Sequence, residues 1–515
     1  PENYELRKRD PTRHVENSTG KLVKLSSLAP EVIKRVTPKN SKPPRLYGLP
    51  KIHKPDTPLR PIVSAIGSPT YNLAKHLTSL LSPLVGNSKH HIKNSKHFIE
   101  IIHNVHTTAG DLLVSFDVES LFTKVPVQDT LQLLKPHFTA DIVALFEHCL
   151  TSSYFMWDKN FYLQRDGVAM GSPLSPAIAN FYMQHFEVGA LDTAELKPSQ
   201  WFRYVDDTFV VWPHGKEKLT RFLDHLNSRH TNIKFTMELE KERELPFLDV
   251  LVHRDDNGSL NHRVYRKPTH TDRYLNAASN HHPAQKRSVI RTLIQRANDI
   301  SDAAHLPAEM KHVRRALQAN GYSTADINRA TRNNSNIKPS DTTPTSKAFL
   351  PYIKHTTDRI AKVLRKKEIV TTFTATTKLG QLTANFKDRL DPLSVPGIYK
   401  VPCDCGSVYI GMTGRSVKQR ITEHERDLRL KHPDRSAVAE HALEHKHTIQ
   451  FDQAEVIARV TGFYNLQRRE AIEIIQHPTN YNREEGFHLS RTWRTLLRNK
   501  QANHDPSPLY AQSHI

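Results

Sequence analysis

Three aspartates in the N-terminal half of the chain have the types and spacing of a metal-binding centre. Asp117 lies near the end of the apolar run LLVSFDV (112–118), and Asp206 and Asp207 interrupt the run FRYVDDTFVVW (202–212). Two such β-rich runs can pair in one sheet, which would bring the carboxylates together. Close carboxylates repel one another unless a divalent cation lies beside them. The alternative is a hairpin turn at the Asp-Asp pair, but its flanks lack Gly, Pro and Asn and favour strands.

The ligand chemistry and the overall charge point to polyphosphate substrates. Oxygen-only ligands suit Mg²⁺ better than Zn²⁺. Two Mg²⁺ ions about 3.5–4 Å apart would activate a 3′-hydroxyl and stabilise a leaving pyrophosphate. The 515-residue chain carries 73 Lys and Arg against 53 acids, a formal net charge of +20, and 31 histidines. We therefore expect nucleic acid as the first partner and an anionic membrane surface as the second.

A second group of reactive side chains occupies the C-terminal region. Two short β-runs around a Cys-rich turn precede two helical segments, in the order PGIYKVPCDCGSVYIG (396–411), TGRSVKQRITEH (413–424) and LQRREAIEIIQ (466–476). The candidates for chemistry are two tyrosines, an arginine, a histidine, an acid and an asparagine: Tyr399, Tyr409, Arg420, His424, Glu470 and Asn482. His424 follows Arg420 by one helical turn and so shares its face. The alternatives are a core tyrosine at position 399 and a surface ion pair between Glu470 and Arg468 or Arg469.

Cysteines and histidines in the same region form a candidate zinc site. Cys403 and Cys405 occupy one turn, and AEHALEHKHTI (439–449) offers three histidines downstream. Two thiolates and two imidazoles suit tetrahedral Zn²⁺. We expect the ligands to be Cys403, Cys405, His441 and His447, with His445 as the substitute. The alternative is two free thiols and an exposed histidine-rich helix.

The elements that must position these groups follow from composition and periodicity. Length suggests about three or four domains. The Pro- and Gly-rich segment 41–70 reads as strands and turns that present cations, whereas Leu spacing predicts helix over 71–106. Further helical patterns cover about 127–152 and, with basic character, 284–330, and the best linker is 331–347. Only three cysteines occur, which fits a reducing compartment, and we see neither a signal peptide nor a membrane-spanning run.

Five segments in order resemble the polymerase motifs of reverse transcriptases. They read LYGLPKIHKPDTPLRPIVS, FDVESLFTKVP, GVAMGSPLSP, YVDD and LPFLDVLVHR. Five motifs at this spacing are far more specific than a lone YVDD. The resemblance implies a right-hand polymerase, with fingers and palm over residues 41–270 and a helical thumb over 271–330. The basic thumb helices would contact the duplex backbone without reading its sequence.

The resemblance also implies roles for single residues. Magnesium would be held by the side chains of Asp117, Asp206 and Asp207 and by the backbone carbonyl of Val118. The incoming nucleotide would meet two cations, one ring and a small-residue turn: Lys51, Arg60, Phe122, Gly171 and Ser172. The alternatives are an ordinary core aromatic at position 122 and solvated surface charges at positions 51 and 60. Leu248 and Asp249 resemble part of a primer grip.

The C-terminal residues 394–495 resemble a GIY-YIG endonuclease. The resemblance rests on GIY, YIG, an Arg and His four residues apart, a helical Glu and a following Asn. It implies phosphodiester hydrolysis with one divalent metal on Glu470. Arg420 would stabilise the charge of the phosphorane, and Tyr409 or Tyr399 would orient or deprotonate the attacking water. Gly411 would leave room for the strand-to-helix turn, and Asn482 would brace the site.

The combination resembles the proteins of Penelope-like retroelements, in which a Cys/His insertion accompanies the nuclease. It implies an α+β multidomain chain: a basic N-terminal extension (1–40), the polymerase, a connector (331–393), the nuclease and a C-terminal tail (496–515). The nuclease would nick target DNA, and the freed 3′-OH would prime copying of template RNA from dNTPs. This target-primed mechanism implies a nuclear location. The rivals are an intron maturase and a decayed or domesticated copy that binds nucleic acid without catalysis.

Overall fold

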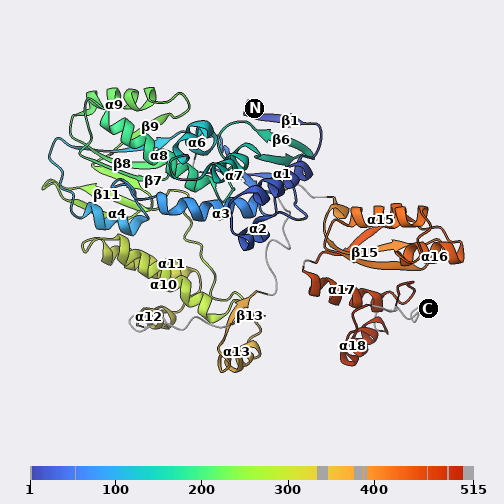
Figure 1. The fold of residues 1–515 in the computed structure, drawn as a ribbon. Helices are drawn as coiled ribbons and strands as arrows, with labels where there is room; N and C mark the ends of the chain where they lie inside the picture. The colour runs from blue at the N-terminus through green and yellow to red at the C-terminus, as the bar shows by residue number, and fades with distance from the viewer. Residues whose placement is uncertain are drawn as a thin grey trace, which may run out of the picture. The chain divides into compact units, whose positions relative to one another are not determined.

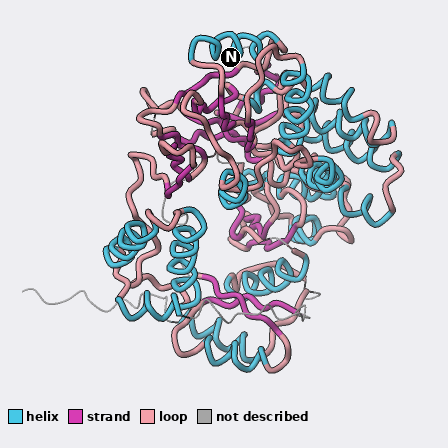
Figure 2. Tube along the Cα trace, turned by 90° about the vertical axis from the view of Figure 1, so that its left-hand side faces the viewer, coloured by secondary structure: helices cyan, strands magenta, loops and turns pink. Residues whose placement is uncertain are grey.

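The computed structural model describes residues 3–52, 54–332, 346–375, 387, 391–460, 462–483 and 486–502. The chain divides into two compact units, residues 1–388 and 389–515 (Figure 1). Both units combine strands and helices. Figure 2 colours the helices cyan and the strands magenta along the chain. Across the described parts of the chain, the model contains no helix with the length and apolar character that a membrane span requires.

A four-stranded antiparallel sheet forms the centre of the first unit. Its order is β7 (Gln200–Tyr204), β8 (Asp207–Trp212), β4 (Leu112–Val118) and β9 (Phe235–Leu239). Side chains alternate between two cores along β8, because Val210 joins the principal core on one face while Phe209 joins a second core on the other. Burial on both faces explains why this strand reads as a continuous apolar run rather than as an alternating one.

Helices cover the principal core. They are α3 (Tyr71–Leu81), α5 (Leu121–Lys124), α6 (Val127–Leu134), α7 (Ala140–Thr151), α8 (Ser175–Asp192) and α9 (Lys216–Ser228). In α3 the buried positions include Leu73, Leu77 and Leu81, one every four residues. This spacing makes one apolar stripe, which faces the core. The Leu spacing therefore predicted the α3 helix and its buried face, but the helix expected over 71–106 is interrupted: residues 85–94 are not helical, and the chain becomes helical again in α4 (Ser95–Ile102).

A second sheet, of five strands, includes the N-terminal segment. Its order is β1 (Tyr4–Arg7), β6 (Asn160–Gln164), β5 (Tyr154–Trp157), β2 (Arg45–Pro50) and β3 (Leu59–Ser64). Two helices follow β1, namely α1 (Thr12–Leu25) and α2 (Pro30–Val36). Val23 of α1 is fully buried in the principal core, and Thr19 contacts His148 of α7 at 2.8 Å. Residues 4–36 thus belong to the first unit, whereas the sequence suggested an N-terminal extension.

A small sheet and three helices follow in the first unit. The sheet contains β10 (Glu244–Phe247), β11 (Val250–Arg254) and β12 (Leu260–Val264), and it packs beside α4 (Ser95–Ile102). The helices are α10 (Pro283–Ile300), α11 (Leu306–Ala319) and α12 (Thr324–Arg332), joined by a core of their own. Ile300 at the end of α10 is buried in the core of the small sheet. The helical pattern of the basic segment was therefore predicted, although it divides into three helices.

The connector contains a folded βαβ unit. It consists of β13 (Ser346–Pro351), α13 (Thr357–Arg365) and β14 (Ile369–Thr374), with the two strands parallel. The 331–347 linker of the sequence prediction lies outside the described residues from 333 to 345. Further along the connector, the Lys387 ammonium donates to Ser64 and lies 5.0 Å from the ring centre of Tyr47.

The second unit is a three-stranded sheet with helices. The strand order is β16 (Val408–Thr413), β15 (Gly397–Pro402) and β17 (Glu455–Ala458). The helices are α15 (Val417–Arg429), α16 (Ala437–His445), α17 (Phe463–Gln476) and α18 (Arg491–Ala502). Because α18 crosses position 496, the C-terminal tail of the sequence prediction begins inside a helix.

Candidate active sites

The β4–β8 pair and the β7–β8 hairpin bring the three aspartates together. Asp117 on β4 lies opposite Asp207 on β8 in the antiparallel register. Tyr204 pairs with Asp207, so Val205 and Asp206 form a two-residue hairpin turn. The Asp-Asp pair is therefore at a turn, contrary to the preference drawn from its apolar flanks. That turn is also what places Asp206 beside Asp117.

The turn is strained and is held from inside the protein. Val205 has φ of +56°, a left-handed conformation that β-branched residues rarely adopt. The Arg203 side chain, 1% exposed, donates to the Val205 carbonyl at 2.9 Å and to Asn180 at 2.8 Å. Its Nε donates to Glu187, also 1% exposed, at 2.7 Å. A buried ion pair beneath the sheet thus fixes the backbone next to Asp206.

Burial, followed by the repulsion of neighbouring carboxylates, raises the pKa of Asp117 and Asp207. Burial and the neighbouring Asp206 raise the pKa of Asp117, while the charges of Lys54 and Lys51 lower it. Burial, followed by Asp206 and Asp117, raises the pKa of Asp207 to about 6, against a smaller lowering by Lys267. Three mutually repelling oxygen donors form a set that a divalent cation would stabilise.

The expected nucleotide-binding residues lie around β2, β3 and the segment before α8. Lys51 follows β2, and its charge acts on Asp117, whereas Arg60 is an exposed residue of β3 paired with Leu49. Ser172 follows directly after Gly171 in the segment before α8.

Phe122 and Gly171 also make close contacts inside the protein. Phe122 is half-buried and packs against the principal core. Gly171 has φ of +125°, and a Cβ there would lie 2.2 Å from the Val63 carbonyl oxygen. The glycine therefore permits close approach of its backbone to β3.

The second unit gathers the tyrosines of its sheet around a buried histidine. Tyr399 of β15 is fully buried, and its hydroxyl lies 2.8 Å from His424 Nε2. The other ring nitrogen of His424 lies 2.7 Å from Ser436 Oγ. Burial lowers the pKa of His424 to about 4 and raises the pKa of Tyr399 well above its ordinary value. Neutral His424 therefore links the tyrosine to the first turn of α16.

Arg420 and Glu470 act on the tyrosines of this centre, and Asn482 supports one of its strands. Arg420 donates to Glu423 at 2.9 Å, and its charge lowers the pKa of Tyr409, although burial raises that pKa overall. Burial raises the pKa of Glu470 to about 7 against a hydrogen bond from the Met412 backbone, which lowers it. Asn482 exchanges two hydrogen bonds with the Ile410 backbone, at 2.9 and 2.5 Å, and so fixes β16.

Gly411 has a different role from the expected one. It lies inside β16 opposite Tyr399, not in a strand-to-helix turn. A Cβ at this position would lie 2.4 Å from the Tyr399 hydroxyl and 2.8 Å from the Tyr409 ring. The glycine therefore makes room for the two tyrosine rings.

Cysteines and histidines converge at the other end of the β15–β16 hairpin. One donor atom from each of four residues lies within 4.8 Å of the others: Cys403, Cys405, His441 and His447. Cys405 Sγ lies 3.4 Å from His441 Nε2, which lies 3.0 Å from His447 Nδ1. His445 stands next to this group but is not part of it. Mixed thiolate and imidazole donors at this spacing fit Zn²⁺.

Comparison with protein families identifies the type of domain that contains the three aspartates. Residues 52–249, which contain all three aspartates, match the family described as reverse transcriptase (RNA-dependent DNA polymerase). They form a reverse transcriptase domain. This confirms the polymerase part of the resemblance and supports RNA-directed DNA polymerase activity. Residues 273–332, which contain the helices after this domain, match the family described as an animal helix-turn-helix domain.

Solved polymerases give weaker likenesses, and no curated protein matches the chain. A Candida albicans telomerase complexed with telomeric RNA has 9% identity and a TM-score of 0.39, over 62% of this chain and 63% of that one. An apo telomerase from Candida tropicalis has 8% identity and a TM-score of 0.35, over 56% and 60%. The BmCPV RNA-dependent RNA polymerase has 10% identity and a TM-score of 0.35, over 59% and 28%. TM-scores at this level carry no argument.

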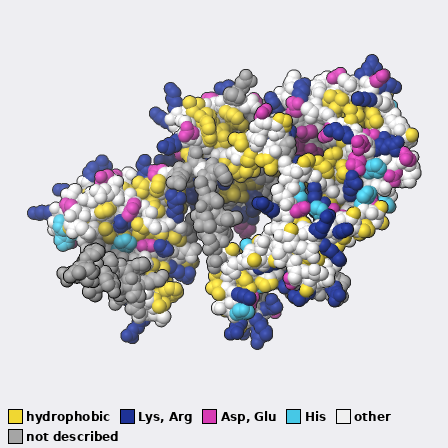
Figure 3. Space-filling model, turned by 180° about the vertical axis from the view of Figure 1, so that it is seen from behind, with side chains coloured by type: hydrophobic (Ala, Val, Ile, Leu, Met, Phe, Trp, Pro, Cys, Tyr) yellow, Lys and Arg dark blue, Asp and Glu magenta, His cyan; other side chains and the backbone are white. Residues whose placement is uncertain are grey.

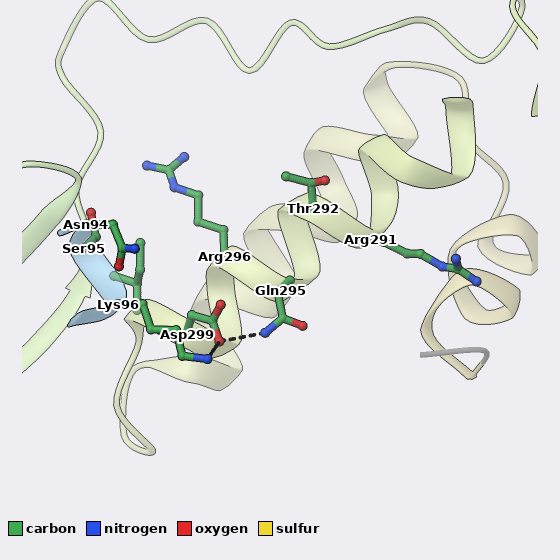
Figure 4. A pocket seen from close by; sticks show the side chains of 9 residues that line it. Asn94, Ser95, Lys96, Arg291, Thr292, Gln295, Arg296 and Asp299 are labelled. Carbon is green, nitrogen blue, oxygen red and sulfur yellow. Dashed lines mark hydrogen bonds and ion pairs between the residues drawn. The ribbon is translucent and has the colours of Figure 1, made fainter. Parts of the chain in front are cut away.

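A groove of about 590 Å³ lies between α4, which belongs to the matched reverse transcriptase segment, and α10, which follows that segment (Figure 4). Arg296 reaches from α10 toward Ser95 and donates to Asp249 at 2.8 Å, and Ser95 also donates to Asp249. Lys96 of α4 pairs with Asp299 of α10 across the groove. Asp249, expected in a primer grip, thus ties the β10–β11 turn to both helices.

Several positioning residues escaped the sequence prediction. Arg203 stands inside the quoted run FRYVDDTFVVW, where a cation between apolar residues was a signal that it is buried and paired. Its partner Glu187 lies 16 residues earlier, on α8, and has no such signal. Lys54, whose charge acts on Asp117, is one of several cations in the segment 41–70, and its type does not distinguish it from the others. Lys267 acts on Asp207 and Ser436 contacts His424, and both contacts depend on tertiary structure.

Proposed function

We propose that the chain is an RNA-directed DNA polymerase joined to a DNA-nicking endonuclease, acting in target-primed reverse transcription of a Penelope-like retroelement. The observation that carries the polymerase part is the register of Asp117 against Asp207, with Asp206 in the adjoining turn. Template RNA, target DNA and dNTPs are the partners in this proposal, and the nucleus is its location. The helix-turn-helix match supports a DNA-binding role for residues 273–332.

In the polymerase site, the side chains of Asp117, Asp206 and Asp207 and the Val118 carbonyl would hold magnesium. When bound, magnesium lowers the pKa of a primer 3′-hydroxyl and stabilises the charge of the leaving pyrophosphate. Lys51 and Lys54, whose charges act on Asp117, meet the triphosphate from the fingers side. Phe122 would close the ribose pocket beside Asp117 and so favour deoxynucleotides.

Primer extension with an RNA template tests this proposal. The Asp206→Ala variant should lose extension, because it removes a ligand without disturbing a buried side chain. Asp224→Ala is the matched control, since Asp224 is an exposed aspartate of α9 in the same half of the chain. Extension by Asp206→Ala at the wild-type rate would discard the site and would favour a decayed, nucleic-acid-binding protein.

In the nuclease site, we propose that Tyr409 rather than Tyr399 meets the attacking water. Arg420 and Glu470 act on both tyrosines, but Tyr409 is only partly buried, whereas Tyr399 is fully buried and its hydroxyl is hydrogen-bonded to His424. Glu470 would hold the divalent metal, and Arg420 would stabilise charge on the phosphorane. Tyr399 and His424 then act by positioning Tyr409.

Nicking of supercoiled plasmid DNA tests the nuclease. Glu470→Ala should abolish nicking and leave primer extension intact. The control is Glu425→Ala, since Glu425 is an exposed glutamate of α15 in the same unit. Tyr409→Phe should lower nicking more than Tyr399→Phe does. Equal nicking by wild type and Glu470→Ala would remove the endonuclease from the proposal.

We also propose structural zinc on Cys403, Cys405, His441 and His447. The close approach of the four donor atoms supports it. Bound there, zinc would tie the β15–β16 turn to the end of α16, away from the tyrosine centre on the same strands. This role is structural, and no step of hydrolysis depends on it.

A further inference from the structure

The βαβ unit of residues 346–374 exposes one face of its sheet. Residues of β13 and β14 alternate between partly buried and exposed positions, as expected when a helix covers only one side. Leu350 and Phe373 pair on the inner side, which α13 covers. Parallel strands are usually covered on both faces. The open outer face of this pair therefore needs an explanation.

The outer face carries an exposed aromatic ring beside a cation. Phe349 is 68% exposed and lies opposite Thr372, while Val370 is 47% exposed and lies opposite Lys347. Lys347 precedes Phe349 by two residues, so both side chains belong to the same face. On this face an exposed ring can stack on a planar group of a ligand, and the neighbouring ammonium can attract a negative charge.

The whole unit is strongly basic. Residues 346–374 contain seven Lys and Arg against two acids. Lys366 and Lys367 lie in the connection that leads into β14, at the end of the sheet where Lys347 stands. Lys and Arg side chains gather over α13 at the lower edge of the view in Figure 3. This excess of cations selects a polyanionic partner over a neutral peptide strand.

The βαβ unit packs against the N-terminal end of α10. The ring of His282, which caps α10, stacks on Phe373 at 4.1 Å between centroids with an interplanar angle of 14°. His282 Nε2 also lies 3.3 Å from an Asp358 carboxylate oxygen, and Gln285 donates to the Phe373 carbonyl at 3.4 Å. These contacts use the inner face and leave Phe349 free to meet a ligand.

We propose that the outer face of β13 and β14 binds single-stranded nucleic acid. An unpaired base stacks on Phe349, and backbone phosphates meet Lys347 and the connection before β14. Stacking on a flat sheet requires a base that is not enclosed in a duplex, which excludes double-stranded DNA as the ligand. Both RNA and DNA single strands have this chemistry. The site is distinct from the polymerase and nuclease centres, and its binding does not depend on either activity.

Fluorescence anisotropy with the full chain tests the proposal. The protein is first loaded with an unlabelled RNA–DNA hybrid to occupy the polymerase groove, without dNTPs. Labelled oligo(U) and oligo(dT) are then titrated, with a duplex of equal length for comparison. Phe349→Ala should weaken single-strand binding about five- to a hundredfold. Phe349→Tyr should restore it, and Ile353→Ala, at a 50% exposed apolar residue of the same unit, should have no effect.

Other outcomes are equally decisive. Photocrosslinking with 5-iodouridine should give an adduct at Phe349, and the preferred oligonucleotide identifies RNA or DNA as the ligand. Binding by Phe349→Leu at wild-type strength would overturn the stacking, because leucine keeps the apolar contact without the ring. Equal weakening of duplex binding would overturn the single-strand preference. Loss of retention on anionic vesicles without any change for oligonucleotides would overturn the proposal in favour of a membrane surface.

Discussion

Replacing Arg203 with Met should impair both stability and polymerisation. The substitution leaves the Glu187 carboxylate buried and unpaired, which costs about 3–5 kcal/mol in the free energy of unfolding. It also removes the hydrogen bond from Nη1 to the Val205 carbonyl. A hydrogen bond from a charged donor contributes about 1.5–3 kcal/mol. This hydrogen bond holds the strained turn that carries Asp206. Losing about 1.5–3 kcal/mol should therefore lower kcat about ten- to a hundredfold.

A double variant separates the two effects. Arg203→Met with Glu187→Gln removes both charges and keeps an acceptor for the Trp201 indole, which donates to Glu187 at 2.8 Å. Neutral replacement of a buried pair is often harmless to stability, so the free energy of unfolding should largely recover. The Val205 carbonyl still lacks its donor, so kcat should stay low while KM for dNTP changes little.

The assay combines denaturant unfolding with steady-state primer extension. The control is Arg254→Met with Glu240→Gln, which removes another buried pair, 10% and 8% exposed with Nη2 2.6 Å from Oε1, that does not contact the turn. Wild-type kcat in the Arg203/Glu187 double variant would show that the pair supports only the fold and does not position Asp206.

Three further predictions concern the second unit. The pKa of histidine is near 6.5 in the unfolded chain, whereas that of folded His424 is lowered to about 4, so the free energy of unfolding should fall by about 1.4 kcal/mol per pH unit as the pH drops from 6.5 to 4. Hydrogen exchange in α15 of the full chain should become faster over this pH range. The His424→Gln variant should not show this change. Gly411→Ala should abolish nicking but not primer extension, because the new methyl group overlaps Tyr399; normal nicking would contradict the packing argument. Cys405→Ser should lower bound zinc measured by elemental analysis, whereas His445→Asn should not; the reverse would exchange the ligand set.

The sequence predicted local elements better than long-range pairings. The apolar runs around Asp117 and Asp206 correctly indicated strands, because central strands bury both faces. The segment YELR (4–7) is polar and gave no such signal. It becomes a strand only by pairing with residues 161–164, more than 150 positions away. Pairings over such distances depend on the whole sheet, which is why residues 1–40 were read as an extension.

In the candidate sites, too, local features could be predicted from the sequence and long-range contacts could not. Residues with reactive side chains could be selected by type and order, as Tyr399, Arg420 and Glu470 were. The groups that hold them could not, because Glu187 and Ser436 are ordinary residues whose partners are set by packing. The Asp206–Asp207 turn was set against metal binding as an alternative, although a hairpin turn is a direct way to present a carboxylate.

The aspartate centre and the tyrosine centre are both held in place by buried polar groups, but the groups differ. Each exposes reactive groups on strands while a buried polar network fixes their backbone or ring. Beneath Asp206 the network is an ion pair, Arg203 with Glu187, whose charges cancel only while both remain. Beside Tyr399 it is a neutral histidine, which loses its hydrogen-bond acceptor on protonation. The aspartate centre should therefore be sensitive to loss of either partner, and the tyrosine centre of the second unit to acid.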